Sequence, residues 1–176
     1  MEPEADKLIM ENISKNLSDQ DEYPATIRIQ GRCISMIGNL WHAKAAIGTP
    51  TVGSSEAVML GGLAMKKRWQ AKRRAEGKDV YHPNIILGNN AQVALEKFAR
   101  YFDVEPRLIP VSEESHHVLD IKKAAEACDE NTIGIFVILG STYTGHFEDV
   151  EGMAKLLDEL QEKKGYDIPI HVDAAR

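Results

Sequence analysis

Cysteine is scarce in this sequence of 176 residues, which contains only Cys33 and Cys128. Two cysteines cannot build a disulfide framework, so the composition fits a reducing compartment. The sequence shows no signal peptide and no apolar run long enough to span a membrane, which predicts a cytoplasmic protein without a membrane partner. Positive charge is not in excess either. The formal net charge of -6 argues against a general nucleic-acid binder.

Several catalytic motifs are also missing. The sequence has no Gly-x-x-x-x-Gly-Lys-Ser/Thr, so a nucleoside triphosphate loop of that kind is excluded. It has no Gly-x-Ser-x-Gly elbow and no Cys/His pairing that would indicate a nucleophile. His116 and His117 lie in a polar loop without metal-ligand spacing to another His or Cys, so no metal site is predicted.

What is present is typical of a soluble globular protein, with 43% hydrophobic and 27% charged residues. The one basic cluster comprises Lys66–Arg68 and Lys72–Arg74 along a predicted helix. It fits either a solvated helix face or a contact with an anion or a partner. Residues 1–24 are acidic and interrupted by prolines. They predict an N-terminal arm that packs on another surface, such as a second subunit.

Residues 25–176 are expected to form the main domain. Apolar residues at helical spacing predict a helix over residues 25–43, and a second helix should run from Gly53 to about residue 75. Ser54 or Ser55 is the expected N-cap of the second helix. The first half of that helix is apolar nearly all round, which predicts deep burial. Gly61 and Gly62 within it indicate close backbone packing.

The rest of the chain alternates between strands and helices. The expected strands are 84–88, 107–111, 132–139 and 168–174, and the expected helices are 91–102, 120–128 and 149–163. Crossovers of this length predict an α/β fold with a mostly parallel sheet and helices on both faces.

Three stretches place chemistry at strand ends and at one helix start. Gly53–Ser55 offers hydroxyls and backbone N–H groups at a helix N-terminus, which suits a phosphate. Gly140–Gly145 follows a buried strand, and the last strand ends at Asp173, with His171 on the same face. The combination suggests a phosphate cradle and a carboxylate for a protonated ring nitrogen, as a pyridoxal phosphate site requires.

Each candidate also has a purely structural interpretation. Ser54 or Ser55 fits a simple helix cap, and phosphate binding is favoured only through the other candidates near it. Asp173 itself fits a helix cap or a turn, and Thr142 and Thr144 fit ordinary turn chemistry. Gln92, which begins the helix after the strand 84–88, fits either an amide lying over an aromatic ring or surface hydrogen bonding.

Taken together, these segments resemble the glutamate decarboxylases, which are group II pyridoxal-phosphate decarboxylases, over essentially the whole chain. The resembling segments follow in the same order along the chain. They are Asp21–Pro24, Asn39–Ala43, Gly53–Ala57, Met59–Gly62, Lys97–Tyr101, Asp129–Gly134, Thr142–Gly145 and His171–Ala175.

The resemblance implies the fold-type-I architecture of aspartate aminotransferase, with this chain forming part of its large domain. It implies pyridoxal 5'-phosphate as the cofactor and L-glutamate as the substrate. The implied reaction is loss of the α-carboxylate as carbon dioxide, which gives 4-aminobutanoate. The complete enzyme is expected to be a homo-oligomer.

The resemblance also assigns residues to the cofactor. Ser54–Ser55 would hold the phosphate, and Gln92 would lie over the pyridine ring. Thr142 would contact the ring substituents, Asp173 would pair with the pyridinium nitrogen, and Ala175 would pack beneath the ring. Because many sister decarboxylases have a stacking His at the Gln92 position, Gln92 favours the glutamate branch.

One departure from the family pattern affects catalysis. Arg176 stands where the family continues with Ser-Gly-Gly, and no Lys follows Asp173, so the Schiff-base lysine is expected beyond the chain end. We therefore expect these residues alone to be an inactive portion of a longer enzyme. Two alternatives remain open: a short non-catalytic paralogue that binds a full-length subunit, and a sister pyridoxal-phosphate decarboxylase or lyase with another substrate.

Overall fold

The computed structural model describes residues 2–16 and 18–175, and the chain divides into two compact units between Thr51 and Val52. Arg176, at which the resemblance departs from the family, lies outside the described residues. The first unit contains helices α1 (Pro3–Asn12) and α2 (Pro24–Leu40), each of which begins with a proline in its first turn. Neither helix has a buried residue. In the described part of the chain, no helix has the length and apolarity needed to cross a bilayer.

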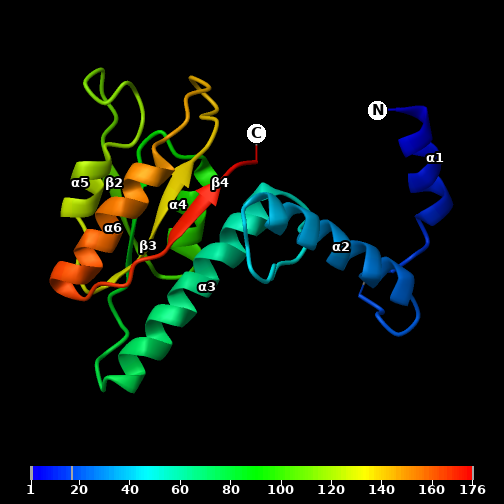
Figure 1. The fold of residues 1–176 in the computed structure, drawn as a ribbon, viewed down its shortest axis with the longest axis horizontal. Coiled ribbons are helices and arrows are strands. Elements are labelled where there is room, and N and C mark those ends of the chain that lie inside the picture. The colour runs from blue at the N-terminus through cyan, green and yellow to red at the C-terminus, as the bar shows by residue number, and fades with distance from the viewer. Residues whose placement is uncertain (1, 17, 176) are drawn as a thin grey trace. The chain divides into compact units, whose positions relative to one another are not determined.

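The second unit is built on a sheet of parallel strands. The strands are β1 (Asn84–Gly88), β2 (Glu105–Ile109), β3 (Thr132–Ile138) and β4 (Ile170–Asp173). Their order across the sheet is β2-β1-β3-β4, and every neighbouring pair is parallel (Figure 1). The carboxyl ends of all four strands therefore share one edge of the sheet.

Helices cover both faces of this sheet. Helices α3 (Ser54–Ala75) and α4 (Val93–Tyr101) contact each other and the strands on one face. Helices α5 (Ile121–Glu126) and α6 (Val150–Lys164) pack together on the other face. Each helix pair encloses its own apolar core, one around Phe98 and the other around Met153. The predicted α/β fold with a parallel sheet between helices is confirmed.

The central strands β1 and β3 are buried along their full length. Their pairing shifts by one residue, because Asn84 pairs with Thr132 whereas Ile85 pairs with Gly134. The extra residue, Ile133, forms a bulge that turns its side chain into the core around Phe98. The apolar runs in the sequence therefore correspond to strands that are covered on both faces.

Some predictions about these elements are wrong. Strand β2 spans Glu105–Ile109 rather than residues 107–111, and β4 begins at Ile170 rather than at residue 168. Pro106 is tolerated in β2 because, within the described residues, this strand pairs on one side only, with β1. The first half of α3 is not deeply buried all round, since Leu60 is 41% exposed. Only the stripe that faces the sheet is buried. The expected close approach at Gly62 is confirmed, because an added Cβ would lie 2.5 Å from the ring of Phe98.

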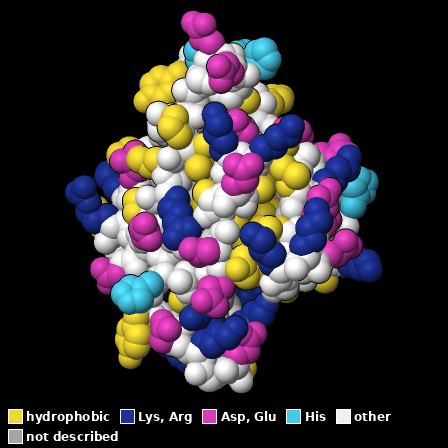
Figure 2. Space-filling view, turned by 90° about the vertical axis from the view of Figure 1, so that its left-hand side faces the viewer, with side chains coloured by type: hydrophobic (Ala, Val, Ile, Leu, Met, Phe, Trp, Pro, Cys, Tyr) yellow, Lys and Arg dark blue, Asp and Glu magenta, His cyan; other side chains and the backbone are white. Residues whose placement is uncertain are grey.

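Charged side chains of both signs are mixed over the face seen in Figure 2, which is the side on which α5 and α6 lie in Figure 1. Lysines and arginines alternate there with aspartates and glutamates, and no broad field of one sign is visible.

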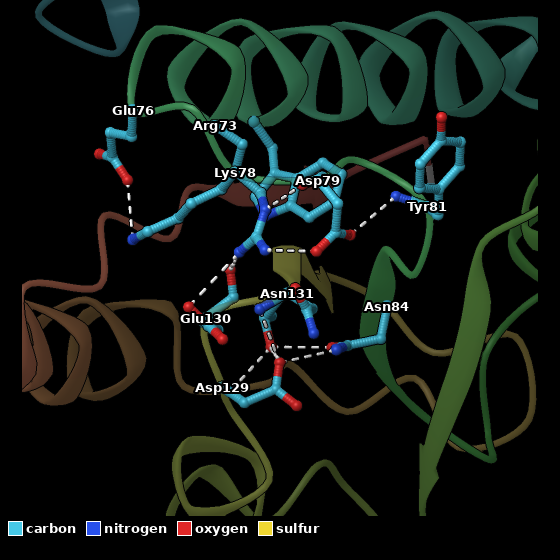
Figure 3. Close-up of polar contacts among 11 residues, drawn as sticks. Arg73, Glu76, Lys78, Asp79, Tyr81, Asn84, Asp129, Glu130 and Asn131 are labelled. Atoms are coloured by element: carbon cyan, nitrogen blue, oxygen red, sulfur yellow. Dashed lines mark hydrogen bonds and ion pairs between the residues drawn. The ribbon is translucent and has the colours of Figure 1, made fainter.

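The last turns of α3 are fixed to the amino edge of the sheet by one buried arginine (Figure 3). The Arg73 side chain is 8% exposed and forms ion pairs of 3.5 Å with both Asp79 and Glu130. It also donates to the backbone oxygens of these two residues and lies 5.2 Å from the ring of Trp69. Part of the basic cluster is therefore structural rather than a solvated face.

A second polar network joins the amino ends of β1 and β3. The amide of Asn84 donates to Asp129 at 2.8 Å, and the Thr132 hydroxyl donates to Asn84 at 2.8 Å. Burial raises the pKa of Asp129, but hydrogen bonds from Asn84 and Arg107 outweigh it and hold that pKa below its ordinary value. The buried polar groups at this edge therefore satisfy one another's hydrogen bonds.

The neighbouring residues Arg73 and Arg74 allow a matched test of the role of Arg73 in holding the last turns of α3 to the sheet. Replacing Arg73 with Met removes charge-assisted bonds from a buried position, so we expect a loss of about 2–3 kcal/mol in unfolding free energy. Replacing the exposed Arg74 with Met should change it by less than about 0.5 kcal/mol. Urea denaturation of the natural gene product measures both changes. Equal effects of the two substitutions would contradict the assigned role of Arg73.

Candidate functional site

A hollow lies at the carboxyl edge of the sheet, beside the start of α3. Its volume is about 120 Å³, which is roughly ten times the space that one water molecule needs. A ligand rather than a single water therefore suits it. Five of the six predicted site residues line it. The full lining set is Ser54, Asn90, Gln92, Ile138, Gly140, Thr142, Asp173 and Ala175.

The two serines stand in the first turn of α3 but do not cap it. The N-cap is Gly53, with an extended backbone, and no side chain forms a cap hydrogen bond. The prediction that Ser54 or Ser55 is the N-cap is therefore wrong. Glu56 reaches back instead and accepts from the backbone N–H of Val52 at 2.7 Å. Within the described residues the hydroxyls of Ser54 and Ser55 have no partner, and the positive end of the helix dipole lies beside them.

Asp173 ends β4 with a half-buried carboxylate. Its one hydrogen bond is accepted from the backbone N–H of Ala175 at 3.3 Å, and no cation of the described chain forms an ion pair with it. This contact, from a backbone N–H two residues on, is the one that a turn-stabilising Asp makes, so the turn interpretation of Asp173 fits the structure beside the ligand-binding one. A half-buried carboxylate without a cation, facing a hollow, suits a positively charged ligand atom.

Gln92 and Thr142 reach the hollow from the segments that follow β1 and β3. The Gln92 side chain accepts from the backbone N–H of Ala94 at 2.7 Å, which caps α4 and fixes the amide. Thr142 lines the hollow, whereas Thr144 accepts from the backbone N–H of His146 and does not. Ser55 is the one predicted site residue outside the lining. It adjoins Ser54, so its contribution stays a prediction.

His171 lies on the same strand as Asp173 but packs between helix and sheet. Its ring meets Phe136 edge-on with centroids 5.1 Å apart. An added Cβ on Gly61 would lie 2.4 Å from His171 Nδ1, so α3 approaches the ring closely only because residue 61 is glycine. Burial lowers the pKa of His171, and the nearby Asp173 opposes this only in part. The neutral imidazole therefore predominates at neutral pH.

Sequence reasoning missed part of the site. Asn90 and Ile138 also line the hollow, together with Gly140 of the predicted stretch Gly140–Gly145, and the buried Glu148 holds Asn90 and Ile138 from behind. The position of Asn90 two residues after a buried strand is a signal that could have identified it. No local pattern identifies Glu148, because its partners are far apart in the sequence.

Other reactive groups lie elsewhere or are inert. Burial raises the pKa of the Cys128 thiol to about 12, so this residue is no nucleophile. Among the residues that the structure covers, no His, Cys, Asp or Glu side chains gather as a metal site. The lining of the hollow contains no lysine. The site is therefore a binding arrangement of hydroxyls, amides and one carboxylate.

The sequence profile described as "Pyridoxal-dependent decarboxylase conserved domain" matches residues 4–176. The chain belongs to this pyridoxal-dependent decarboxylase family. It is 56% identical over 179 residues to the glutamate decarboxylase of Saccharomyces cerevisiae, an alignment that covers 98% of this chain and 31% of the yeast protein. It is 54% identical over 180 residues to glutamate decarboxylase 5 of Arabidopsis thaliana, covering 99% of this chain and 36% of that protein.

Among solved structures, the Lactobacillus brevis glutamate decarboxylase superposes with a TM-score of 0.93 at 40% identity, covering 99% of this chain and 41% of that one. The predicted membership in the group II decarboxylases is confirmed, and so is the fold-type-I relationship. The chain spans about a third of the length of the curated relatives it matches.

The residues of the hollow fit the cofactor from which the pyridoxal-dependent decarboxylase family takes its name. Ser54 presents a hydroxyl without a partner in the described chain at a helix N-terminus, and the Ser55 hydroxyl adjoins it, as a phosphate dianion requires. Asp173 presents a carboxylate that forms no ion pair with a cation of the described residues, as a protonated ring nitrogen requires. The polar atoms that lack protein partners here are thus the ones that the cofactor would engage.

The half-buried His171 predicts a pH dependence of stability. Its pKa is lowered from 6.5 in the folded state, so the unfolded state binds more protons once the pH falls below that value. We expect the unfolding free energy to decrease as the pH falls below 6.5, and to decrease less in His171→Phe, which keeps an aromatic ring but cannot titrate. Urea denaturation at several pH values measures this. A similar flattening in the exposed His82→Asn would show that His171 is not responsible.

Proposed function

We propose that the protein containing these residues is a pyridoxal 5'-phosphate-dependent decarboxylase that removes the α-carboxylate of L-glutamate as carbon dioxide and leaves 4-aminobutanoate. Residues 52–175 supply much of its cofactor pocket. The observation that carries the proposal is the single hollow in which Ser54 and Asp173 occur together. Identities of 54% and 56% to glutamate decarboxylases support the choice of substrate.

Each predicted site residue has a proposed task. Ser54 and Ser55 would bind the phosphate through their hydroxyls and the helix N-terminus. Gln92 would lie against the ring with its amide held by Ala94, and Thr142 would donate to an oxygen on the ring. Ala175 would leave room beneath the ring.

Asp173 would determine the electronic state of the bound cofactor. When bound, pyridoxal phosphate supplies an electron sink for the negative charge that the departing carboxylate leaves behind. The Asp173 carboxylate would hold a proton on the ring nitrogen and so strengthen that sink. We assign no catalytic residue within the described chain, because no lysine lines the hollow.

The proposal also covers the subunit contacts and the compartment of the enzyme. Helices α1 and α2 have no buried residues. Leu8, Met10 and Leu40 are exposed on them, and so is Trp41, which follows α2. Residues 1–24 would act as an arm against another subunit of a homo-oligomer, and residues 25–176 would form part of the large domain. The net charge of -6 and the low cysteine content fit a cytoplasmic enzyme without nucleic-acid or membrane partners.

The cofactor assignment is tested by paired substitutions in the natural gene product. Ser54→Ala, which removes a hydrogen bond to a charged group, should raise the Kd for pyridoxal phosphate about ten- to a hundredfold. Asp173→Asn should bind the cofactor but lower kcat strongly, with a changed visible absorption band. Spectroscopic titration and carbon dioxide release measure these effects.

Two matched controls accompany these variants. Thr144→Ala changes a hydroxyl in the loop of Thr142 that does not reach the hollow, and Asp167→Asn changes a carboxylate that pairs with Arg68 away from the hollow. Both should keep cofactor affinity and kcat near those of the natural protein. If Ser54→Ala and Asp173→Asn behave like these controls, the pocket assignment is wrong.

A panel of L-amino acids tests the substrate. The proposal predicts release of carbon dioxide from L-glutamate, with little from L-aspartate or from aromatic amino acids. Preferential turnover of an aromatic amino acid would identify a sister decarboxylase instead.

A further inference from the structure

Glu148 is a buried carboxylate with an unusual set of partners. It is 3% exposed, and none of its contacts in the described chain is an ion pair with a cation. Its Oε1 accepts from the Asn90 side-chain amide at 3.0 Å and from the backbone N–H of Leu119 at 3.1 Å. Its Oε2 accepts from the backbone N–H of Ile138 at 2.7 Å. One carboxylate thus connects three segments that are distant in sequence.

Two of these donors belong to the wall of the hollow. Asn90 follows β1 and precedes Gln92, whereas Ile138 ends β3 and precedes Gly140 and Thr142. Glu148 does not itself line the hollow. It stands behind two wall segments and joins them, so its carboxylate acts on the site through Asn90 and Ile138 alone.

On the β3 side the contact is reciprocal. The backbone N–H of Glu148 donates to the oxygen of Ile138 at 3.0 Å, while the Glu148 side chain accepts from the N–H of Ile138. Leu139 and Phe147 form an antiparallel bridge beside this pair. The loop between them carries Gly140 and Thr142. The carboxylate therefore closes the base of the loop that presents Thr142.

On the β1 side the Asn90 amide depends on Glu148 for its orientation. Its Nδ2 donates to Glu148, and its Oδ1 is buried and has no partner in the described chain. This oxygen lies over Gly88, where an added Cβ would be only 2.2 Å away. No other hydrogen bond holds the amide, so loss of the Glu148 contact frees a side chain of the wall.

We infer that Glu148 is a positioning residue for the cofactor pocket, which sets the spacing of the Gln92 and Thr142 walls through Asn90 and Ile138. This inference rests on the proposed function. The adjacent Asp149 serves as a contrast, because it only caps α6 by accepting from the N–H of Gly152 at 2.8 Å. A change at Asp149 should affect stability alone, whereas a change at Glu148 should affect the pocket.

The substitution Glu148→Gln tests the inference with almost no change of shape. The introduced amide can accept on one side only. If its oxygen faces Asn90 and Leu119, its NH₂ group opposes the N–H of Ile138. If it is reversed, its NH₂ opposes the N–H of Leu119, and Asn90 can accept from it only by turning its own amide over, which places the Asn90 NH₂ group over Gly88. Either orientation therefore disturbs one wall of the hollow.

Adding Asn90→Asp to Glu148→Gln should restore both walls. The introduced glutamine then donates to the introduced aspartate and accepts from the N–H of Ile138, and only Leu119 loses its acceptor. Leu119 does not line the hollow. The double variant should therefore recover the pocket while remaining less stable than the natural protein, a combination that a merely structural role does not predict.

The experiment measures the Kd for pyridoxal phosphate, the visible circular dichroism of the bound cofactor and the urea midpoint in the natural gene product. Glu148→Gln should raise the Kd about tenfold or more and change the dichroism. Asn90→Asp should have the same two effects, because it sets the carboxylate of residue 90 against that of Glu148. The double variant should return within about threefold of the natural Kd. Asp149→Asn should lower the midpoint and keep the Kd within about twofold.

Each possible result bears either on the inference or on the proposed function. A natural Kd in Glu148→Gln, or a double variant no better than the single one, overturns the inference. If Glu148→Gln does not fold, Asn90→Asp tests the inference in its place, because this variant keeps both backbone N–H donors to Glu148. A natural Kd in Asn90→Asp also overturns the inference. If the natural protein itself does not bind pyridoxal phosphate, the proposed function fails instead, and the two failures are distinguishable.

Discussion

The common direction of the four strands is the constraint on which the rest of this structure depends. Parallel strands need coverage on both faces, which α3 with α4 and α5 with α6 provide. Once the strands run one way, their carboxyl ends must meet at one edge. Asn90, Thr142 and Asp173 come together for this reason, although β1, β3 and β4 are far apart along the chain. The first turn of α3 adds Ser54 at the same edge.

The two edges of the sheet differ in how completely their polar groups are hydrogen-bonded within the described chain. At the amino edge, Asn84, Asp129 and Thr132 satisfy one another, and Arg73 is matched by Asp79 and Glu130. At the carboxyl edge, the hydroxyls of the serines and the carboxylate of Asp173 lack equivalent partners within the described chain. Because Ser54 and Ser55 are exposed and Asp173 is only half-buried, water or a ligand can engage these groups. The amino edge therefore stabilises the fold, and the carboxyl edge is available for chemistry.

The sequence was sufficient for the fold because the fold follows from local patterns. Five of the six residues that the family resemblance assigned to the cofactor line one hollow, and their binding roles stay predictions. Apolar runs such as Ile85–Leu87 marked the buried strands, and their alternation with helices predicted the layers. Asp173 was identifiable as an acid at the end of such a strand. The assignment of Ser54 and Ser55 as caps was wrong because a serine at a helix start has two possible tasks, and local sequence does not distinguish capping from ligand binding.

What the sequence did not reveal depends on long-range pairing. Arg73 resembles the exposed basic residues around it, and only its contacts with Glu130 and Trp69 explain its burial. Glu148 resembles an ordinary acid before a helix, yet its partners include Asn90 and Leu119, and its function depends on their convergence. Such roles arise from tertiary packing, which is set by residues that no local window contains.

The central claim is that one hollow at the carboxyl edge binds the phosphate at the start of α3 and the ring nitrogen at the end of β4. A crystal structure of the natural gene product with pyridoxal phosphate tests it most directly. The account predicts phosphate oxygens within hydrogen-bonding distance of the hydroxyls of Ser54 and Ser55, and the ring nitrogen facing the carboxylate of Asp173. A phosphate bound elsewhere, or a ring nitrogen turned away from Asp173, would contradict it.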